Sequence, residues 1–325
     1  MRRVWLVIEQ RRGGRWETGH PVSAVLVDSD GGVVEQVGED VVSPWRSAAK
    51  PFQLEVSAGL LNPKVLGGLD PRDLALGAAS HSGEPAHTQR VLELLRRLGC
   101  DVEDLYCGTH WPLREQSGRD LLRHGEEANP LHNNCSGKHT FMAAAARAHG
   151  WPSDYRDPNH PLQQRIRANI EARTAVSVGA VVDGCGVPCW VLPVSGMARA
   201  WAQLAAAMKQ GETSLLGRIG WAMQRNPFFA SGTVRSDGAV MEQSARPAVA
   251  KIGAEGLMCG SLSEDGLGFA LKVHTGNSDA RAIATFAVLE RWFPGLLPSE
   301  ASAPWTVVRN VVARPIGERV AVWDA

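Results

Sequence analysis

A serine and a lysine stand three residues apart early in the chain, in the segment Ser47-Ala48-Ala49-Lys50, which is followed by Pro51. Proline is tolerated in the first turn of a helix and is costly deeper inside it, so we expect a helix that begins near Ser47. Residues three apart on a helix face the same side, which brings this hydroxyl and amine within reach of proton exchange. The positive end of the helix would also stabilise negative charge developing on the serine oxygen. The pattern predicts a serine nucleophile with a lysine as its base.

A lysine accepts a proton only when it is neutral, and for an ordinary lysine this state costs roughly 4–5 kcal/mol at pH 7. Burial and a second cation nearby are the two usual ways to lower that cost. Taken alone, a Ser-x-x-Lys segment favours an ordinary exposed turn of helix. The chemistry therefore depends on what the rest of the chain can add to it.

Two further segments carry hydroxyl, imidazole or amine groups. Residues 78–84 are small and polar, contain Ser80 and His81, and end before Pro85, a favourable first residue of a helix. Such a segment fits an active-site loop between two helices. Without a catalytic partner residue from elsewhere in the chain, it favours a helix cap. Late in the chain, Lys251 lies on an expected strand, in the segment Lys251-Ile252-Gly253.

The cysteines form the other group of candidates. Cys135 and Lys138 lie in the polar segment 129–139, where a helix is expected to begin, and Cys185 follows Asp183 at the end of an expected strand. The residues alone favour a buried thiol for Cys135 and a phosphate- or carboxylate-binding lysine for Lys138. The remaining thiols are expected to be structural, because free cysteine is among the most buried residue types: Cys100, Cys107 and Cys259.

The composition limits the possible functions. The chain has 325 residues, 44% of them hydrophobic, which suffices for one large domain or two intimate ones with a substantial core. Its 34 basic and 34 acidic side chains give a formal net charge of zero, which argues against nucleic-acid or membrane-surface binding. The apolar run at 4–8 is too short for a signal sequence, and no segment is long enough to cross a bilayer. We therefore expect a cytoplasmic protein with reduced cysteines.

Strand patterns lie at both ends of the chain and helical patterns fill the middle. A sheet assembled from both ends with an inserted helical lobe is the simplest packing, and the fold class is α/β (α+β). We expect a single domain over 1–325, with a sheet lobe of about 1–60 and 240–325 and a helical lobe of about 61–239. The expected strands are 4–9, 22–27, 33–37, 178–182, 249–253, 256–262, 267–273, 305–313 and 319–323. The main expected helices are 85–98, 140–148, 162–173, 197–209, 213–224 and 283–292, with a loop at 226–237.

An early Ser-x-x-Lys and a late Lys-x-Gly strand resemble the arrangement in serine β-lactamases and penicillin-binding proteins. Here Ile252 stands where those proteins have threonine, and there is no clear Ser-x-Asn between the two motifs. The chain more closely resembles the type II L-asparaginases of the Rhizobium inducible kind, over nearly its whole length. This resemblance rests on the motifs at 47–53, 79–84, 132–139, 183–185 and 251–256.

The resemblance implies hydrolysis of L-asparagine to aspartate and ammonia on a fold like that of serine β-lactamases and penicillin-binding proteins. It implies two Ser–Lys pairs, Ser47 with Lys50 and Ser80 with Lys251. It also implies a zinc ion, whose ligands would be Cys135, Lys138 and Cys185, and a homodimer. We expect Cys189, which follows Pro188, to be a turn thiol outside the ligand set.

Three interpretations remain open. In the first, Ser47 attacks the side-chain amide of L-asparagine, Lys50 accepts its proton, and Ser80 and Lys251 relay protons while water hydrolyses the acyl-enzyme. Which serine attacks is not settled by the residues. In the second, the protein is a glutaminase or a β-lactam-reactive acyl hydrolase. In the third, it is a zinc-binding structural protein without catalytic activity.

Overall fold

A computed structural model describes residues 4–324, so Met1 to Arg3, part of the N-terminal segment considered above, lie outside it. Backbone contacts divide the chain into two compact units. The first consists of the described residues up to Ala48, of Leu192–Ala206 and of the chain from Ala239 on. The second consists of Ala49–Val191 and Ala207–Gly238. The first helix of the chain thus groups with the helical unit, and part of α8 (Val194–Lys209) groups with the sheet.

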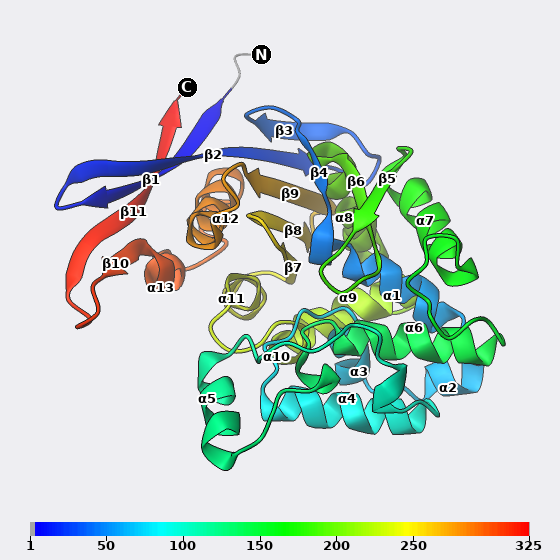
Figure 1. Cartoon of the computed structure of the whole chain (residues 1–325). Helices are drawn as coiled ribbons and strands as arrows, with labels where there is room; N and C mark the ends of the chain where they lie inside the picture. Colours follow the sequence, from blue (N-terminus) through cyan, green and yellow to red (C-terminus); the bar gives the residue numbers. More distant parts are fainter. Residues whose placement is uncertain (1–3, 325) are drawn as a thin grey trace. The chain divides into compact units, whose positions relative to one another are not determined.

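The first unit contains an antiparallel sheet built from both ends of the chain, as predicted (Figure 1). Its strands follow the order β10-β11-β1-β2-β9-β8-β7, and β3 pairs separately with β2. The N-terminal strand β1 therefore lies between β2 and the C-terminal strand β11. The strands are β1 (Trp5–Arg12), β2 (Arg15–Val27), β3 (Val33–Val37), β7 (Ala248–Gly253), β8 (Leu257–Leu262), β9 (Leu267–Val273), β10 (Val307–Arg309) and β11 (Pro315–Asp324). The fold class, mixed α/β with an antiparallel sheet, is confirmed.

The first hairpin of the sheet was not predicted. Strands β1 and β2 are joined through Gly13 and Gly14, whose φ angles of 54° and 78° lie in the left-handed region that a tight hairpin turn requires. β2 begins at Arg15, whereas the sequence predicted a strand only from residue 22. The first half of β2 is largely exposed and polar, so it lacks the alternation that signals a strand. The predicted pairing of 22–27 with 33–37 is confirmed.

Helix α12 (Ser278–Trp292) covers apolar residues of the sheet in the first unit. Asn277 caps it, accepting a hydrogen bond from the backbone N–H of Ala280 at 2.8 Å. Its side chains Ile283 and Leu289 are buried in one hydrophobic cluster with residues of the sheet such as Phe269. This cluster is the core of the unit.

The second unit is mainly helical. Its helices are α1 (Lys50–Gly59), α2 (Pro63–Gly67), α3 (Pro71–Gly77), α4 (Pro85–Arg97), α5 (Glu115–His124), α6 (Ser136–Ala148), α7 (Pro161–Thr174), α9 (Leu215–Arg225) and α10 (Pro227–Ala230). Helix α6 contacts α1, α3, α4 and α7, and its residues 136–146 are all buried, polar ones included. A helix buried on all sides, with a lysine and a histidine among its buried residues, is unusual and marks α6 as a candidate part of a site.

Three predictions of local structure were wrong. The segment 226–237 was expected to be a loop. It contains α10, and residues 236 and 237 already belong to α11 (Ser236–Gln243). Cys189, expected in a turn, lies in strand β6 (Pro188–Pro193), which pairs with β5 (Gly179–Val182). Pro188 is the first residue of β6, a position where the missing N–H is tolerated, so a proline there did not exclude a strand. The expected strand at 305–313 is divided between α13 (Ala303–Thr306) and β10.

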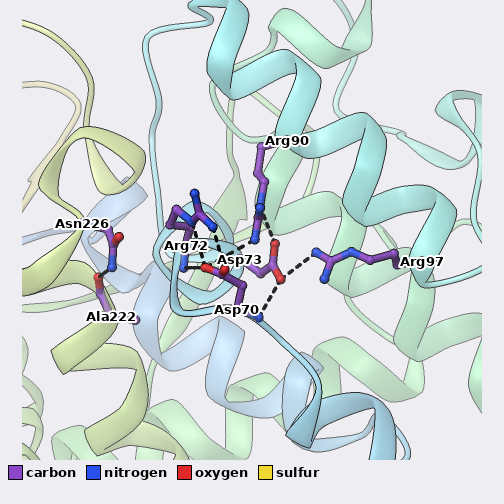
Figure 2. Close-up of polar contacts among 7 residues, drawn as sticks. All are labelled: Asp70, Arg72, Asp73, Arg90, Arg97, Ala222 and Asn226. Atoms are coloured by element: carbon purple, nitrogen blue, oxygen red, sulfur yellow. Dashed lines mark hydrogen bonds and ion pairs between the residues drawn. The ribbon is translucent and has the colours of Figure 1, made fainter.

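An ion-pair cluster fixes α3 to α4, the two helices that flank the polar segment 78–84 (Figure 2). Asp73 of α3 has no exposed surface and accepts hydrogen bonds from Arg90 Nε at 2.7 Å and from the backbone N–H of Asp70 at 2.9 Å. Arg97 Nη2 lies 2.6 Å from Asp73 Oδ2. Two arginines of α4 therefore contact the Asp73 carboxylate. The cluster therefore holds both ends of the segment that carries Ser80.

We expect Asp73→Ala to lower the free energy of unfolding by about 3 kcal/mol, because it leaves the largely buried Arg90 without the carboxylate that lies closest to it. Urea denaturation monitored by circular dichroism measures this change. The matched control is Asp120→Ala, whose carboxylate forms an exposed pair with Arg123 and whose loss should cost less than about 1 kcal/mol. Equal, small effects of the two substitutions would show that the cluster does not stabilise α3 on α4.

Candidate functional site

Ser47 lies in a 3-10 turn, η1 (Arg46–Ala49), that leads directly into α1. The helix start predicted near Ser47 is thus present, but its first turn is 3-10 and the α-helix begins at Lys50. Arg46 has a φ of 50°, a left-handed conformation that costs energy for a residue with a side chain. The buried Trp201 supports the turn, because its indole N–H donates a hydrogen bond to the carbonyl of Ala48 at 3.2 Å.

Lys50 has no exposed surface, and its Nζ lies among three oxygen atoms of the second unit. These are Ser80 Oγ at 2.8 Å, the carbonyl of Ala79 at 2.5 Å and the carbonyl of Asn134 at 3.4 Å. A neutral amine has two N–H donors and one lone pair. Donation to the two carbonyls would therefore direct the lone pair toward the Ser80 hydroxyl, which is the arrangement of a base that takes a proton from serine.

Burial lowers the pKa of Lys50, because the charged form is desolvated, and the cation of Lys138 acts in the same direction. The thiolate character of Cys135 opposes both effects, but the net direction is downward. Lys138 is thus a neighbouring cation that favours the neutral base. Lys138 lies in the same unit as Lys50.

Ser80 is held in place by a buried network around His81. The Nδ1 atom of His81 accepts a hydrogen bond from the backbone N–H of Gly83 at 3.1 Å, so the proton of a neutral ring lies on Nε2. Nε2 lies 2.8 Å from the hydroxyl of Ser136, the first residue of α6. Burial holds the pKa of His81 well below its usual range, which keeps the ring neutral. The segment that carries Ser80 is therefore tied to the start of α6.

Cys135, Lys138 and Cys185 meet in one buried cluster. Cys135 is the residue before α6, Lys138 is its third residue, and Cys185 follows β5, so two separate elements converge as predicted. Lys138 Nζ lies 3.2 Å from Cys185 Sγ, and Cys135 Sγ lies 3.2 Å from Asn134 Oδ1. The neighbouring Cys185 thiol and the amines of Lys50 and Lys138 hold the pKa of Cys135 well below its usual range, against the effect of burial. These neighbours therefore favour the thiolate form of Cys135.

This donor set fits a zinc ion. Zinc binds thiolate sulfur at about 2.3 Å and nitrogen at about 2.1 Å, so neighbouring donors in a tetrahedral site lie about 3.5 Å apart, close to the contact between Lys138 and Cys185. Burial disfavours the charge on Lys138, but the two thiols and Asp183 outweigh it and raise its pKa above the usual value. Zinc binding would therefore have to displace a proton from this amine. No cluster of three or more His, Cys, Asp or Glu side chains suited to a metal occurs within residues 4–324.

The remaining predicted residues lie apart from this cluster along the chain. Lys251 is in the edge strand β7 of the first unit, has no exposed surface, and donates to the carbonyl of Ile252 at 3.3 Å. Cys189 pairs with Val181 across β5 and β6 and is buried. Burial raises the pKa of the Cys107 thiol to about 12, and also raises the pKa values of Cys100 and Cys259, as expected for structural cysteines.

Sequence reasoning missed the segment 231–238, which had been assigned to a loop. Thr233 donates two hydrogen bonds to the carboxylate of Glu84, four residues after Ser80, and Ser82 donates to the carbonyl of Ser231 at 3.3 Å. Its composition, Ser-Gly-Thr-Val-Arg-Ser-Asp-Gly, is as rich in small polar residues as the segment 78–84 and could have drawn attention to it.

Comparisons with known proteins agree with these motifs. A family model described as L-asparaginase II matches residues 8–320. No curated protein matches the chain significantly. Among residues 4–324 there is no helix with the length and apolar character needed to cross a membrane.

Several solved structures are similar to this chain at low sequence identity. One is Mglu in its native form in 4.3 M NaCl, 14% identical over 84% of this chain, with a TM-score of 0.46. The present chain spans only 61% of that protein. Another is Mglu in its L-glutamate binding form, 14% identical over 84% of this chain and 60% of that one, with a TM-score of 0.45. A β-lactamase from Mycobacterium bovis is 10% identical over 83% of this chain and 94% of that one, with a TM-score of 0.43.

Proposed function

Because the chain belongs to the L-asparaginase II family and is therefore a hydrolase that acts on amides, we propose that it hydrolyses L-asparagine to L-aspartate and ammonia. The observation that carries the proposal is the contact of a fully buried lysine, Lys50, with the Ser80 hydroxyl at 2.8 Å. A lysine whose pKa is lowered by burial, beside a serine, is the pair that activates an oxygen nucleophile without an imidazole.

In the proposed reaction, Ser47 attacks the side-chain carbonyl of asparagine, and its proton passes to Lys50 through the Ser80 hydroxyl, which Lys50 contacts at 2.8 Å. The tetrahedral intermediate collapses, the C–N bond breaks, and the leaving nitrogen takes up a proton to depart as ammonia. Water then attacks the ester, and its proton returns through the same groups to restore Ser47 and release aspartate. We assign Ser80, in contact with Lys50, to the relay of these protons, and Lys251 to the second Ser–Lys pair with Ser80.

Zinc is proposed to bind to Cys135, Lys138 and Cys185. A bound zinc ion would supply a fixed positive charge and Lewis acidity beside Lys50. The chain's own serine and lysine groups already provide a nucleophile and a base, so we assign the metal to substrate binding more than to the chemical step. Asp183, which acts on Lys138 electrostatically, would help to orient this ligand. We also propose a homodimer, on the basis of the family resemblance, and a cytoplasmic location, on the basis of the sequence.

We expect the purified protein to release ammonia from L-asparagine, with lower kcat/KM for L-glutamine and no hydrolysis of a β-lactam. The measurement is a coupled ammonia assay for the two amides and ultraviolet absorbance for the β-lactam. The Lys50→Met variant serves as a control for contaminating activity. Preferential turnover of glutamine or the β-lactam would replace the proposed substrate, and inactivity toward all three would favour a structural role.

A further inference from the structure

The segment 231–238 lies against the segment that carries Ser80, within the second unit. Thr233 donates to Glu84 from its backbone N–H at 2.9 Å and from its hydroxyl at 2.8 Å. Ser82 donates to the carbonyl of Ser231 at 3.3 Å. These hydrogen bonds fix residues 231–233 beside residues 82–84, two to four positions beyond Ser80.

The backbone of the segment is shaped for this close approach. Gly232 has a φ of 123°, and a Cβ atom at this position would lie 2.0 Å from Ser82 Oγ, so no other residue fits there. Val234 has a φ of 53°, which is a strained conformation for a β-branched side chain. Strain of this kind persists only where surrounding contacts impose it. The strained residue, Val234, directly precedes Arg235.

The guanidinium of Arg235 is poorly paired, although its side chain is only 19% exposed. Its Nε atom is buried and has no hydrogen-bond partner among the described residues. The nearest carboxylate oxygen is Asp237 Oδ1 at 3.8 Å, which is too far for a hydrogen bond. That oxygen already accepts hydrogen bonds from the Ser231 hydroxyl at 2.5 Å and from the backbone N–H of Gly238 at 3.1 Å.

Arg235 also lies close enough to the Ser80 segment to act on it electrostatically. Its positive charge is one of the influences that lower the pKa values of His81 and His87, after the larger effect of burial. His81 follows Ser80 directly in the chain. A cation with one unpaired hydrogen-bond donor thus lies within electrostatic range of His81, the residue that follows Ser80.

We propose that Arg235 binds the α-carboxylate of the amino-acid substrate and thereby selects substrates that carry one. This inference rests on the proposed amide hydrolysis and adds to it a determinant of specificity. A guanidinium presents parallel N–H donors in a planar fork that matches the two oxygens of a carboxylate. Because one of its donors is buried and unpaired in the free protein, binding a carboxylate would satisfy a donor that now lacks a partner.

The test compares L-asparagine with L-asparaginamide, which replaces the α-carboxylate with a neutral amide and keeps the scissile side-chain amide. We expect the wild-type enzyme to prefer asparagine in kcat/KM by about 100-fold, the effect of losing charge-assisted hydrogen bonds. In Arg235→Gln, kcat/KM for asparagine should fall by about 100-fold, chiefly through a higher KM. The value of kcat/KM for asparaginamide should change by less than about 3-fold. Arg235→Lys should lie between the two. Ammonia release measures all of these rates.

The matched control is Arg225→Gln, in the same unit, whose guanidinium is exposed and pairs with Glu212. It should leave the preference for asparagine unchanged. If Arg235→Gln keeps the wild-type preference, or loses turnover of both substrates equally, the inference is overturned while the proposed function stands. If the wild-type enzyme does not hydrolyse asparagine, the proposed function fails and the inference fails with it.

Discussion

Replacing Lys50 with methionine should lower kcat for L-asparagine by about 10⁴-fold, the usual effect of removing a member of a nucleophile–base pair. Methionine has nearly the length of lysine and suits a fully buried position, but it cannot accept a proton. Its loss would leave the Ser80 hydroxyl without the amine that lies 2.8 Å away. Steady-state ammonia release, with the melting temperature measured on the same preparation, tests this expectation.

Lys64→Met is the matched control, because Lys64 lies in the short helix α2 of the same unit and is exposed. Its activity should equal that of the wild type. Ser47→Ala and Ser80→Ala then separate the nucleophile from the relay: mass spectrometry of quenched enzyme should find no acyl adduct in Ser47→Ala, and some adduct in Ser80→Ala. A Lys50→Met enzyme with more than a tenth of wild-type kcat would remove this lysine from the chemistry.

The second large effect concerns the metal. Purified wild-type protein should contain about one zinc ion per chain, and Cys135→Ala and Cys185→Ala should contain almost none, because a site with two protein ligands cannot hold zinc firmly. Cys189→Ala is the matched control, since this thiol is equally buried but lies in strand β6, paired with Val181. It should retain the metal. Inductively coupled plasma mass spectrometry measures the zinc content.

Chelation of the wild-type enzyme should raise KM for asparagine and leave part of kcat at saturating substrate, because the serine and lysine groups remain in place. Loss of zinc from Cys189→Ala, together with its retention in Cys185→Ala, would contradict the proposed ligand set. Complete loss of turnover at every asparagine concentration, with an unchanged melting temperature, would show that the metal takes part in the chemical step.

The architecture was largely predictable because its signals are local. The strands β7, β8 and β9 are short apolar runs between clear turns, and helices such as α4 and α7 begin at proline and have regular apolar spacing. The exceptions lack such signals. The first half of β2 is polar and exposed, and 226–237 is rich in the residues that favour loops. In both cases tertiary contacts decide the conformation, and a single sequence does not contain them.

The sequence motifs named the candidate residues of the site but not the contacts between them. The motifs identified Lys50, Ser80, Cys135, Lys138 and Cys185, and the structure places all five in one unit with hydrogen bonds or electrostatic contacts among them. The direct contact between Lys50 and Ser80 joins residues thirty positions apart, and no periodicity reports such a contact. Arg235 escaped notice for the same reason: the small polar residues around it mark the segment as unusual, but they do not report the contacts of its guanidinium.

Lys50, Lys138 and Lys251 have at most 1% of their surface exposed, which has a consequence for how such a protein can evolve. Water solvates a lysine better than a protein interior does, so burying each of these amines carries a desolvation cost. For Lys50, where burial is the main cause of the lowered pKa, an apolar side chain of similar size would fill the same volume without that penalty. Selection for thermal tolerance alone would therefore remove this lysine, and selection for turnover retains it. Mutations that raise the melting temperature should accumulate outside this cluster, where stability and activity do not compete.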